Sequence, residues 1–490
     1  MKAKHAAIIT SIVSLIGFIY FTFPYKLGLS PDSVSYIFTA ESILKGNGVV
    51  NEYGVFVSHW PPLYTILLAL VSKITLANIQ LSALYLNAVL IFSLPILYFQ
   101  IIKAVNLKYT YKILLPIILV VSWATLRHRF LLTEGLFLTL LLLVILFFLK
   151  WVKHNKIKYL IASGLLSSLL ILTRYAGIGF LAGFCFYLLF IQPKSIRYKF
   201  KTLGIYIIST SFLFLIWLLY YKGMDTSKSI REFQFHPISW LQLISIFKVM
   251  AKWIISTIPI GIAFLFLIIV GLASSKITTT LQLIKENIAI SKTYLSLIII
   301  LIVSYILFII IALTFFDSRI PISNRIFSCL YPLLLMLIAL VFNFSIEKKR
   351  LNNLVLIGFV LLFCGAIYRT STQWIYHYNN GTGYTAKRWK NSEVIKYIES
   401  SDSLNIYSNA HDIARFYKNI NNDYLPFPEL ETYQQDLDLM EKEVLNGNKE
   451  ILYFNNIYRP YFITKDSLLN HFKAYDIRCF EDGFLISKPN

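Results

Sequence analysis

Long runs of apolar residues, separated by short polar segments, dominate the first three quarters of the chain. A run of about 18 or more such residues can cross a bilayer as a helix. The runs predict about eleven spanning helices. Their approximate ranges are 6–24, 80–102, 111–128, 132–150, a pair within 158–192, 203–221, 253–272, 294–316, 325–345 and 353–369. The pattern therefore indicates an α-helical polytopic membrane protein.

A long, mostly polar segment follows the first apolar run. Lys2, Lys4 and His5 precede the first apolar run, and cytoplasmic loops are enriched in basic residues, so we expect a cytoplasmic N-terminus. The apolar piece 62–74 is too short to cross the membrane, since a span needs about 20 residues. Residues 25–79 are therefore predicted to form one large external loop.

The composition changes near residue 370, where apolar runs shorten and Asn, Asp, Glu and Tyr become frequent. We expect residues 1–370 to be the membrane module and residues 371–490 a small external α/β domain. Ser392 is a candidate helix cap. The segments 404–407 and 451–454 are typical of short strands.

Composition narrows the class of protein. Hydrophobic residues make up 57% of the chain and charged residues 14%, which is far from an ordinary soluble protein. The net charge of +21 lies in short loops between apolar runs, as the positive-inside rule predicts, and does not indicate a nucleic-acid partner. The four cysteines are scattered without a CxxC spacing, so neither a structural zinc site nor a disulfide framework is expected.

The chemistry that the sequence suggests begins at Asp32, just after the first predicted span. A Pro-Asp-Ser sequence before an amphipathic segment is a common helix start, so Asp32 could simply be a helix cap. A carboxylate at the membrane surface could also act as a general base. His59, before Trp60 and two prolines, could be a ligand or hydrogen-bond donor, or could be structural.

Several positive charges fall at predicted outer ends of spans, where the positive-inside rule makes them unusual. They are Arg127, Arg129, Arg174, Arg319 and Arg325. Each could simply reach toward lipid headgroups. Their planar guanidinium groups also suit a lipid phosphate. Glu134 opens a predicted span, where the helix dipole favours it, or it could pair with Arg127 or serve as a second acid.

The order of these motifs resembles that of a known superfamily. Asp32-Ser33-x-x-Tyr36, Gly46-x-Gly48 and Trp60-Pro61-Pro62-Leu63-Tyr64 are similar to the first external loop of the GT-C membrane glycosyltransferases. The resemblance is to the branch with protein O-mannosyltransferases and the lipid A aminoarabinose transferase. Further similar segments are 132–137, 172–177, Asn324-Arg325 with Tyr331-Pro332, 391–395 and 406–410.

The resemblance implies an enzyme of a bacterial plasma membrane that transfers a sugar from a polyprenyl-phosphate carrier to a lipid, glycan or protein acceptor outside. Asp32 would be the general base, the anomeric centre would be inverted, and external arginines would stabilise the departing phosphate. The residues that would bind donor or substrate are Arg174, Arg325, Arg127, Glu134, His59 and Tyr36. Many relatives carry Asp-Glu where this chain has Asp32-Ser33, so metal dependence stays open and no metal ligand is predicted.

Two other functions fit a membrane protein of this kind. A transporter of lipid-linked sugars predicts ionisable residues near span centres, and the spans here are nearly free of them. A glycan polymerase or ligase would carry its main functional loop later in the chain. The glycosyltransferase hypothesis predicts that Asp32, Glu134, Arg174 and Arg325 line one cavity.

Overall fold

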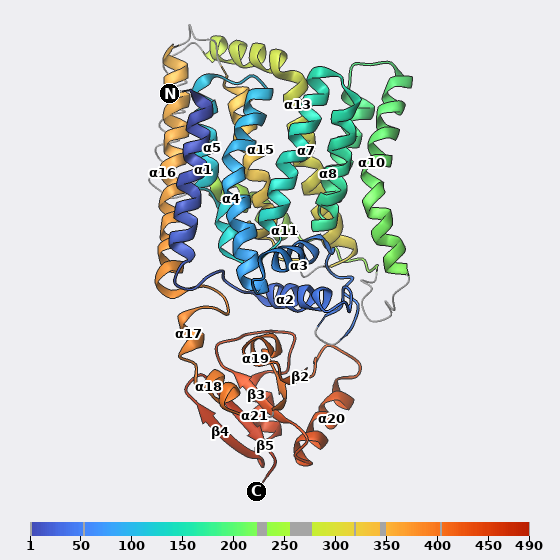
Figure 1. Cartoon of the computed structure of the whole chain (residues 1–490), viewed down its shortest axis with the longest axis vertical. Helices are drawn as coiled ribbons and strands as arrows, with labels where there is room; N and C mark the ends of the chain where they lie inside the picture. Colours follow the sequence, from blue (N-terminus) through green and yellow to red (C-terminus); the bar gives the residue numbers. More distant parts are fainter. Residues whose placement is uncertain are drawn as a thin grey trace. The chain divides into compact units, whose positions relative to one another are not determined.

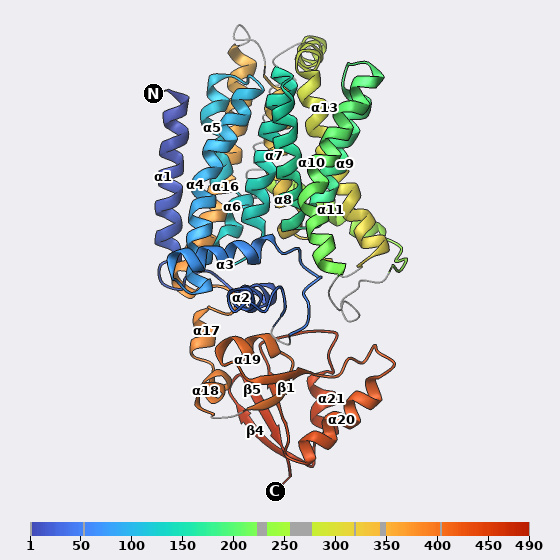
Figure 2. The same cartoon turned by 45° about the vertical axis from the view of Figure 1, so that its right-hand side comes forward.

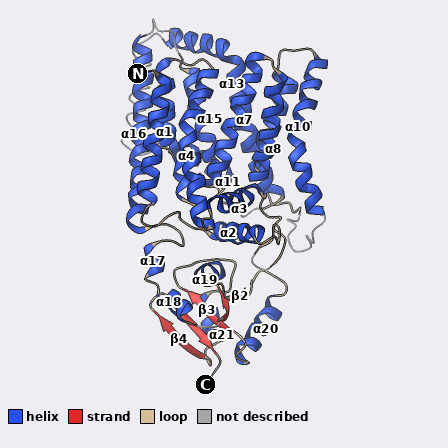
Figure 3. Ribbon diagram, in the orientation of Figure 1, coloured by secondary structure: helices blue, strands red, loops and turns tan. Residues whose placement is uncertain are grey.

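The computed structural model describes residues 2–51, 54–222, 233–254, 277–317, 320–343, 349–401 and 404–489. The chain divides into two compact units. The first consists of Met1–Leu27 and Ser35–Tyr378, and the second of Gly28–Val34 and Asn379–Asn490. The described part of the first unit is helical, whereas the named strands all belong to the second (Figure 3).

The first unit is a bundle of long helices with several short ones. Its helices, in chain order, are α1 (Ala3–Thr22), α2 (Pro31–Leu44, whose first four residues belong to the second unit), α3 (Leu63–Thr75), α4 (Ile79–Ala104), α5 (Tyr109–Val120), α6 (Trp123–Leu126), α7 (Glu134–His154), α8 (Ile157–Thr173), α9 (Gly177–Phe186), α10 (Ile196–Lys222), α11 (Trp240–Ile254), α13 (Ile277–Phe315), α14 (Asn324–Phe327), α15 (Tyr331–Val341) and α16 (Lys349–Asn380).

Eight helices among the described residues are long and apolar enough to cross a membrane, and each overlaps one of the predicted spans. The pair predicted within 158–192 forms two helices, Ile157–Thr173 and Gly177–Ile191, which are shorter than the other eight. The span predicted at 253–272 lies almost wholly outside the described residues. The chain is thus a multi-pass membrane protein, as predicted.

Two short helices lie crosswise at one end of the bundle. Figures 1 and 2 show α3 and α2 at the end opposite the N-terminus. Helix α3 has 13 residues, which is well below the length of a span. Both helices belong to the loop 25–79, where the sequence predicts a segment that does not cross.

Small residues bring several of the long helices into close contact. A Cβ at Gly164 on α8 would lie 2.6 Å from Cβ of Ser209 on α10, and one at Gly179 on α9 would lie 2.8 Å from Cβ of Phe308 on α13. Such residues let helix backbones approach closely in membranes, where burial from water supplies no driving force between helices. The bundle is therefore held by tight packing around α8, α9, α10 and α13.

The second unit is a small α/β domain built on one five-stranded sheet with the order β2-β1-β3-β5-β4. Strand β1 pairs in parallel with β2 and β3, and β5 pairs antiparallel with β3 and β4. Its elements are α17 (Lys387–Lys390), α18 (Glu393–Ser400), β1 (Asn405–Ser408), α19 (His411–Tyr417), β2 (Asn421–Tyr424), α20 (Tyr433–Leu445), β3 (Glu450–Phe454), α21 (Lys465–His471), β4 (Asp476–Phe480) and β5 (Gly483–Ser487).

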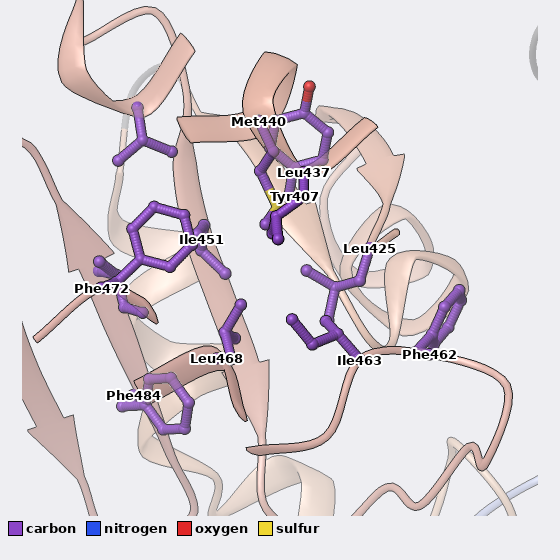
Figure 4. Close-up of a cluster of buried hydrophobic side chains, with 12 residues drawn as sticks. Tyr407, Leu425, Leu437, Met440, Ile451, Phe462, Ile463, Leu468, Phe472 and Phe484 are labelled. Atoms are coloured by element: carbon purple, nitrogen blue, oxygen red, sulfur yellow. The ribbon is translucent and has the colours of Figure 1, made fainter. Parts of the chain in front are cut away.

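A cluster of buried apolar side chains joins the sheet to its helices (Figure 4). Ile451 of β3 and Phe484 of β5 lie in one cluster with Leu437 and Met440 of α20 and Leu468 of α21. The strands predicted at 404–407 and 451–454 are confirmed as β1 and β3. The small C-terminal α/β fold is therefore confirmed, while its external location stays a prediction.

Candidate functional site

Glu134 holds two arginines together. Its Oε1 atom accepts a hydrogen bond from Nη1 of Arg174 at 2.7 Å and another from Nε of Arg325 at 2.5 Å. The Glu134 side chain is 6% exposed, against 19% for Arg174 and 26% for Arg325. Three residues singled out in the sequence therefore meet in one partly buried ion cluster. Together with the nearby Arg127, we call these residues the arginine cluster.

The local structure explains how three distant segments reach this point. Glu134 opens α7, where the positive end of the helix dipole favours a carboxylate. Arg174 follows the last residue of α8 and has an extended backbone, with φ −152° and ψ 131°, so the chain leaves the helix there. Gly177 begins α9, and a Cβ on it would lie 3.1 Å from the Ile171 backbone. Arg325 lies in the single turn of α14.

A third arginine lies near this ion cluster. Arg127 is near enough to Glu134 and Arg325 for their charges to interact. Within the described part of the chain, the arginine cluster therefore brings three guanidinium groups around the Glu134 carboxylate. Among the described residues, Oε2 of Glu134 and Nε of Arg127 have no hydrogen-bond partner. Such a site is suited to an anion with several oxygens, because guanidinium groups bind phosphate through pairs of N–H donors.

Arg129 lies near Arg127, but its described hydrogen bonds go elsewhere. Its Nη1 donates to the main-chain oxygen of Gln373 at 2.6 Å, and its Nη2 donates to the Gln373 side-chain oxygen at 2.9 Å. Arg129 therefore joins the segment before α7 to α16. Arg319 lies outside the described residues.

Tyr36 and His59 lie in a group of aromatic side chains. The Tyr36 ring is 5.8 Å from Trp60 and 5.3 Å from Tyr64, and the His59 ring is 4.4 Å from Trp60. Tyr36 is also near enough to Arg174 for electrostatic interaction. The aromatic rings of the loop and the arginine cluster therefore neighbour each other.

A contact that the sequence did not suggest reinforces this arrangement. The Tyr175 hydroxyl, one residue after Arg174, donates to the main-chain oxygen of Ser58 at 3.1 Å. Thr133, one residue before Glu134, accepts from Nη1 of Arg174 at 3.1 Å. Both lie inside segments that the sequence singled out, but only the folded chain shows which side chains meet.

Asp32 lies in the second unit and is the second residue of α2. The N-terminus of this helix is capped by two serines. The Ser30 amide donates to Oγ of Ser33 at 3.0 Å, and the Val34 amide donates to the Ser30 carbonyl at 3.2 Å. Asp32 is four positions before Tyr36, so the two residues lie on the same face of the helix. The half-buried carboxylate of Asp32 thus stands in the first turn of α2.

The described residues include no group of three or more His, Cys, Asp or Glu side chains that could hold a metal ion. We therefore assign no metal ligand among these residues.

The chain as a whole shares its fold with solved structures. The chain is similar to ArnT from Cupriavidus metallidurans bound to undecaprenyl phosphate, with a TM-score of 0.54 and 11% sequence identity over 98% of this chain and 99% of that one. The fold is that of a GT-C-type membrane protein. The apo state of the same ArnT gives a TM-score of 0.52, with 11% identity over 98% of both chains.

No protein-family model matches the chain, and no curated protein sequence matches it. The similarity is therefore one of fold over nearly the full length. It confirms the predicted GT-C-type architecture, and the roles of individual residues are argued from their geometry.

Proposed function

We propose that this chain is an integral-membrane glycosyltransferase. It moves a sugar from a polyprenyl-phosphate carrier to a lipid, glycan or protein acceptor on the outer face of the membrane. Two observations support the proposal: the fold is similar to an ArnT structure bound to undecaprenyl phosphate, and the arginine cluster gathers three guanidinium groups at one place. The second carries most weight, because it is observed in the side chains of this protein.

In the proposed reaction, Asp32 accepts the proton of the acceptor hydroxyl as its oxygen attacks the anomeric carbon. The bond from that carbon to the carrier phosphate breaks, and the phosphate leaves with the bonding electrons. Attack from the face opposite the phosphate inverts the anomeric centre. Asp32 is suited to this role because its carboxylate stands half-buried in the first turn of α2 and offers oxygen atoms that can accept a proton.

Arg174 and Arg325 take the role of phosphate ligands. Charge grows on the leaving phosphate in the transition state, and donors placed in advance stabilise it without reorganisation. Glu134 fixes both guanidinium groups, since each donates to the same oxygen atom. Arg127 adds a third positive charge nearby. Tyr36 and His59 line the adjoining aromatic group and are proposed to contact the sugar.

The test is a transfer assay with purified protein. Wild type and Asp32→Asn are given a panel of undecaprenyl-phosphate sugars with candidate acceptors, and released undecaprenyl phosphate is measured. Asn keeps the shape of Asp and removes its basicity. We expect release by the wild type and a fall of about 10²–10⁴-fold in Asp32→Asn, the usual contribution of a general base.

Other outcomes would direct the assignment elsewhere. Equal release by both proteins would leave a transferase without Asp32 as its base. Chain growth on the lipid carrier, without single-sugar transfer, would favour a glycan polymerase or ligase. Movement of an intact lipid-linked sugar across a vesicle membrane, without release of its phosphate, would favour a transporter.

A further inference from the structure

The segment that carries Asp32 is bound to the start of the C-terminal domain. Leu29 forms a parallel β-bridge with Gly383, and the Tyr384 amide donates to the Leu29 carbonyl at 2.9 Å. Leu29 is only 1% exposed. Both partners belong to the second compact unit, together with Asp32. The segment before α2 is thus part of this domain, although Leu29 and Gly383 are far apart in the sequence.

Gly383 is required at this contact for two reasons. Its φ of +61° lies in the left-handed region that side chains disfavour. A Cβ at this position would overlap the Leu29 carbonyl oxygen and lie 2.8 Å from its carbonyl carbon. Any residue larger than glycine would therefore push Leu29 away from the domain.

The path from Leu29 to Asp32 is short and fixed. The Ser30 amide donates to Oγ of Ser33 at 3.0 Å, and the two serine hydroxyls are 3.1 Å apart. Pro31 lies between Ser30 and Asp32 and has a restricted φ. Displacement of Leu29 is therefore transmitted to Asp32 through Ser30 and Pro31, whose conformations are constrained.

Tyr384 is held from the other side by an ion pair. Its hydroxyl donates to Oδ2 of Asp412 at 2.5 Å, and Nη2 of Arg459 donates to Oδ1 of the same carboxylate at 2.5 Å. The Tyr417 hydroxyl donates to the Tyr384 carbonyl at 2.8 Å. The side chains of Tyr384 and Asp412 are almost completely buried. Tyr384 is therefore fixed at its amide, its carbonyl and its hydroxyl.

This ion pair lies at the edge of the sheet where α/β folds usually bind ligands, outside the carboxyl ends of the parallel strands. Asp412 follows β1, and Arg459 follows β3. Asn409, between β1 and Asp412, donates to the main-chain oxygens of Phe454 and Ile457, each at 3.0 Å. The Asp412–Arg459 pair at this edge is thus bonded to Tyr384, the residue that holds Leu29.

We propose that the C-terminal domain positions Asp32, and that Gly383 and Tyr384 are its positioning residues. The inference rests on the proposed function, in which Asp32 is the general base. The domain holds Leu29 through the Gly383-Tyr384 backbone, and the Asp412–Arg459 pair holds Tyr384. Gly383 and Tyr384 therefore serve the chemistry through Asp32.

The test combines kinetics with hydrogen exchange on the full-length protein. Gly383→Ala is compared with Gly447→Ala, a matched control at φ +70° in the same domain, where the new Cβ would meet only the flexible Lys488 side chain. The donor is the undecaprenyl-phosphate sugar that the wild type uses best. We expect kcat to fall about 10- to 100-fold in Gly383→Ala, as for other small displacements of a reacting group. Affinity for undecaprenyl phosphate should stay unchanged, and exchange of the 25–40 segment should rise. Gly447→Ala should match the wild type in all three.

The double variant decides whether Gly383 acts through Asp32. In an Asp32→Asn background, Gly383→Ala should cause no further loss beyond about twofold, because residues that act as a unit are not additive. A full additional loss would overturn the inference. A wild-type kcat in Gly383→Ala, together with a reduced kcat in Asp32→Asn, would also overturn the inference. This outcome would leave the proposed function intact.

Failure of the proposed function has a different signature. A wild-type rate in Asp32→Asn, or a wild type that releases nothing from any donor, would overturn both the base assignment and this inference. If Gly383→Ala does not fold, Tyr384→Phe replaces it. This variant keeps the hydrogen bond from its main-chain amide to Leu29 and loses the hydrogen bond from its hydroxyl to Asp412. We expect kcat to fall several-fold, with no further loss when it is combined with Asp32→Asn.

Discussion

Arg174 and Arg325 donate to the same oxygen atom of Glu134, at 2.7 and 2.5 Å. Two guanidinium groups this close repel each other unless an anion lies between them. A partly buried carboxylate with two cationic partners is costly to remove, because it leaves uncompensated charge. Glu134 therefore has a structural role in keeping the arginines together, besides any role in catalysis.

Removal of this carboxylate should destabilise the protein in a way that an anionic ligand can repair. We expect Glu134→Gln to lower the free energy of unfolding by about 3 kcal/mol, near the lower end for a broken buried ion pair. Thermal unfolding in detergent measures the change. Undecaprenyl phosphate should restore more stability to Glu134→Gln than it adds to the wild type, because its phosphate can take the place of the carboxylate.

The control for this prediction is Glu441→Gln. Glu441 pairs with His471 at 2.9 Å on the surface of the C-terminal domain, where such pairs contribute between about 0 and 1 kcal/mol. Equal destabilisation by both substitutions would contradict the role given to Glu134. An equal ligand effect in wild type and Glu134→Gln would contradict phosphate binding by the arginines.

A lysine at position 174 should not replace arginine. In the described contacts, Nη1 of Arg174 binds Glu134 and Thr133, and a guanidinium carries further N–H donors for a phosphate. A lysine ammonium keeps the charge and loses the planar fork. We expect the rate of lipid phosphate release to fall about 10²-fold in Arg174→Lys, as for removal of one donor to a developing anion.

Arg129→Lys is the matched control for that substitution. Arg129 was also predicted at an outer end of a span, but its described hydrogen bonds go to Gln373 and not to Glu134. The rate of Arg129→Lys should stay within about twofold of the wild type. A large loss in Arg129→Lys with none in Arg174→Lys would move the phosphate site away from Arg174.

The architecture was predictable where local signals determine it. Apolar runs mark eight of the helices, and Ser392 is a cap because its hydroxyl accepts from the Ile395 amide at 3.1 Å. The strand at 451–454 is marked by consecutive apolar and aromatic residues, which suit a buried strand. Such signals act within a few residues, so they can be read without knowledge of the fold.

The pairings within the sites were not predictable, because they join distant segments. The sequence suggested Arg127 as a partner of Glu134, whereas the hydrogen bonds come from Arg174 and Arg325, at 40 and 191 residues' separation. The bridge between Leu29 and Gly383 has no signal either, since a glycine with positive φ looks like any other in sequence. The ties of Tyr384 to Asp412 are hidden for the same reason.

The stability of the C-terminal domain should fall as the solution becomes acidic. Burial lowers the pKa of His411 to about 4, opposed by the nearby Asp412 carboxylate, while Arg459 and Arg415 lower it further. The unfolded chain has the ordinary histidine pKa of about 6.5 and so takes up a proton first. The contribution of neutral His411 is therefore present above pH 6.5 and is lost as the pH falls toward 4, by roughly 3 kcal/mol at most.

Pulse proteolysis of the full-length protein in urea, between pH 4.5 and 7.5, measures this change. His411→Gln cannot gain a proton, so its stability should depend less steeply on pH in this range. His471→Gln serves as the control, because His471 is 30% exposed on the same domain. A pH dependence unchanged by His411→Gln would assign acid sensitivity to other groups.

Adjacent residues of α20 should differ sharply in their effect on domain stability. Met440 is fully buried in the cluster that joins α20 to the sheet, whereas Leu439, one position before it, is 53% exposed. Met440→Ala should lower the free energy of unfolding by about 2–5 kcal/mol, through lost burial and the cavity left behind. Leu439→Ala should change it by less than about 0.5 kcal/mol. Urea unfolding followed by proteolysis within residues 405–487 compares them.

Because the domain is proposed to hold Asp32, Met440→Ala should also lose transfer activity at the urea concentration where the domain unfolds. Activity that persists beyond that point would separate the domain from catalysis.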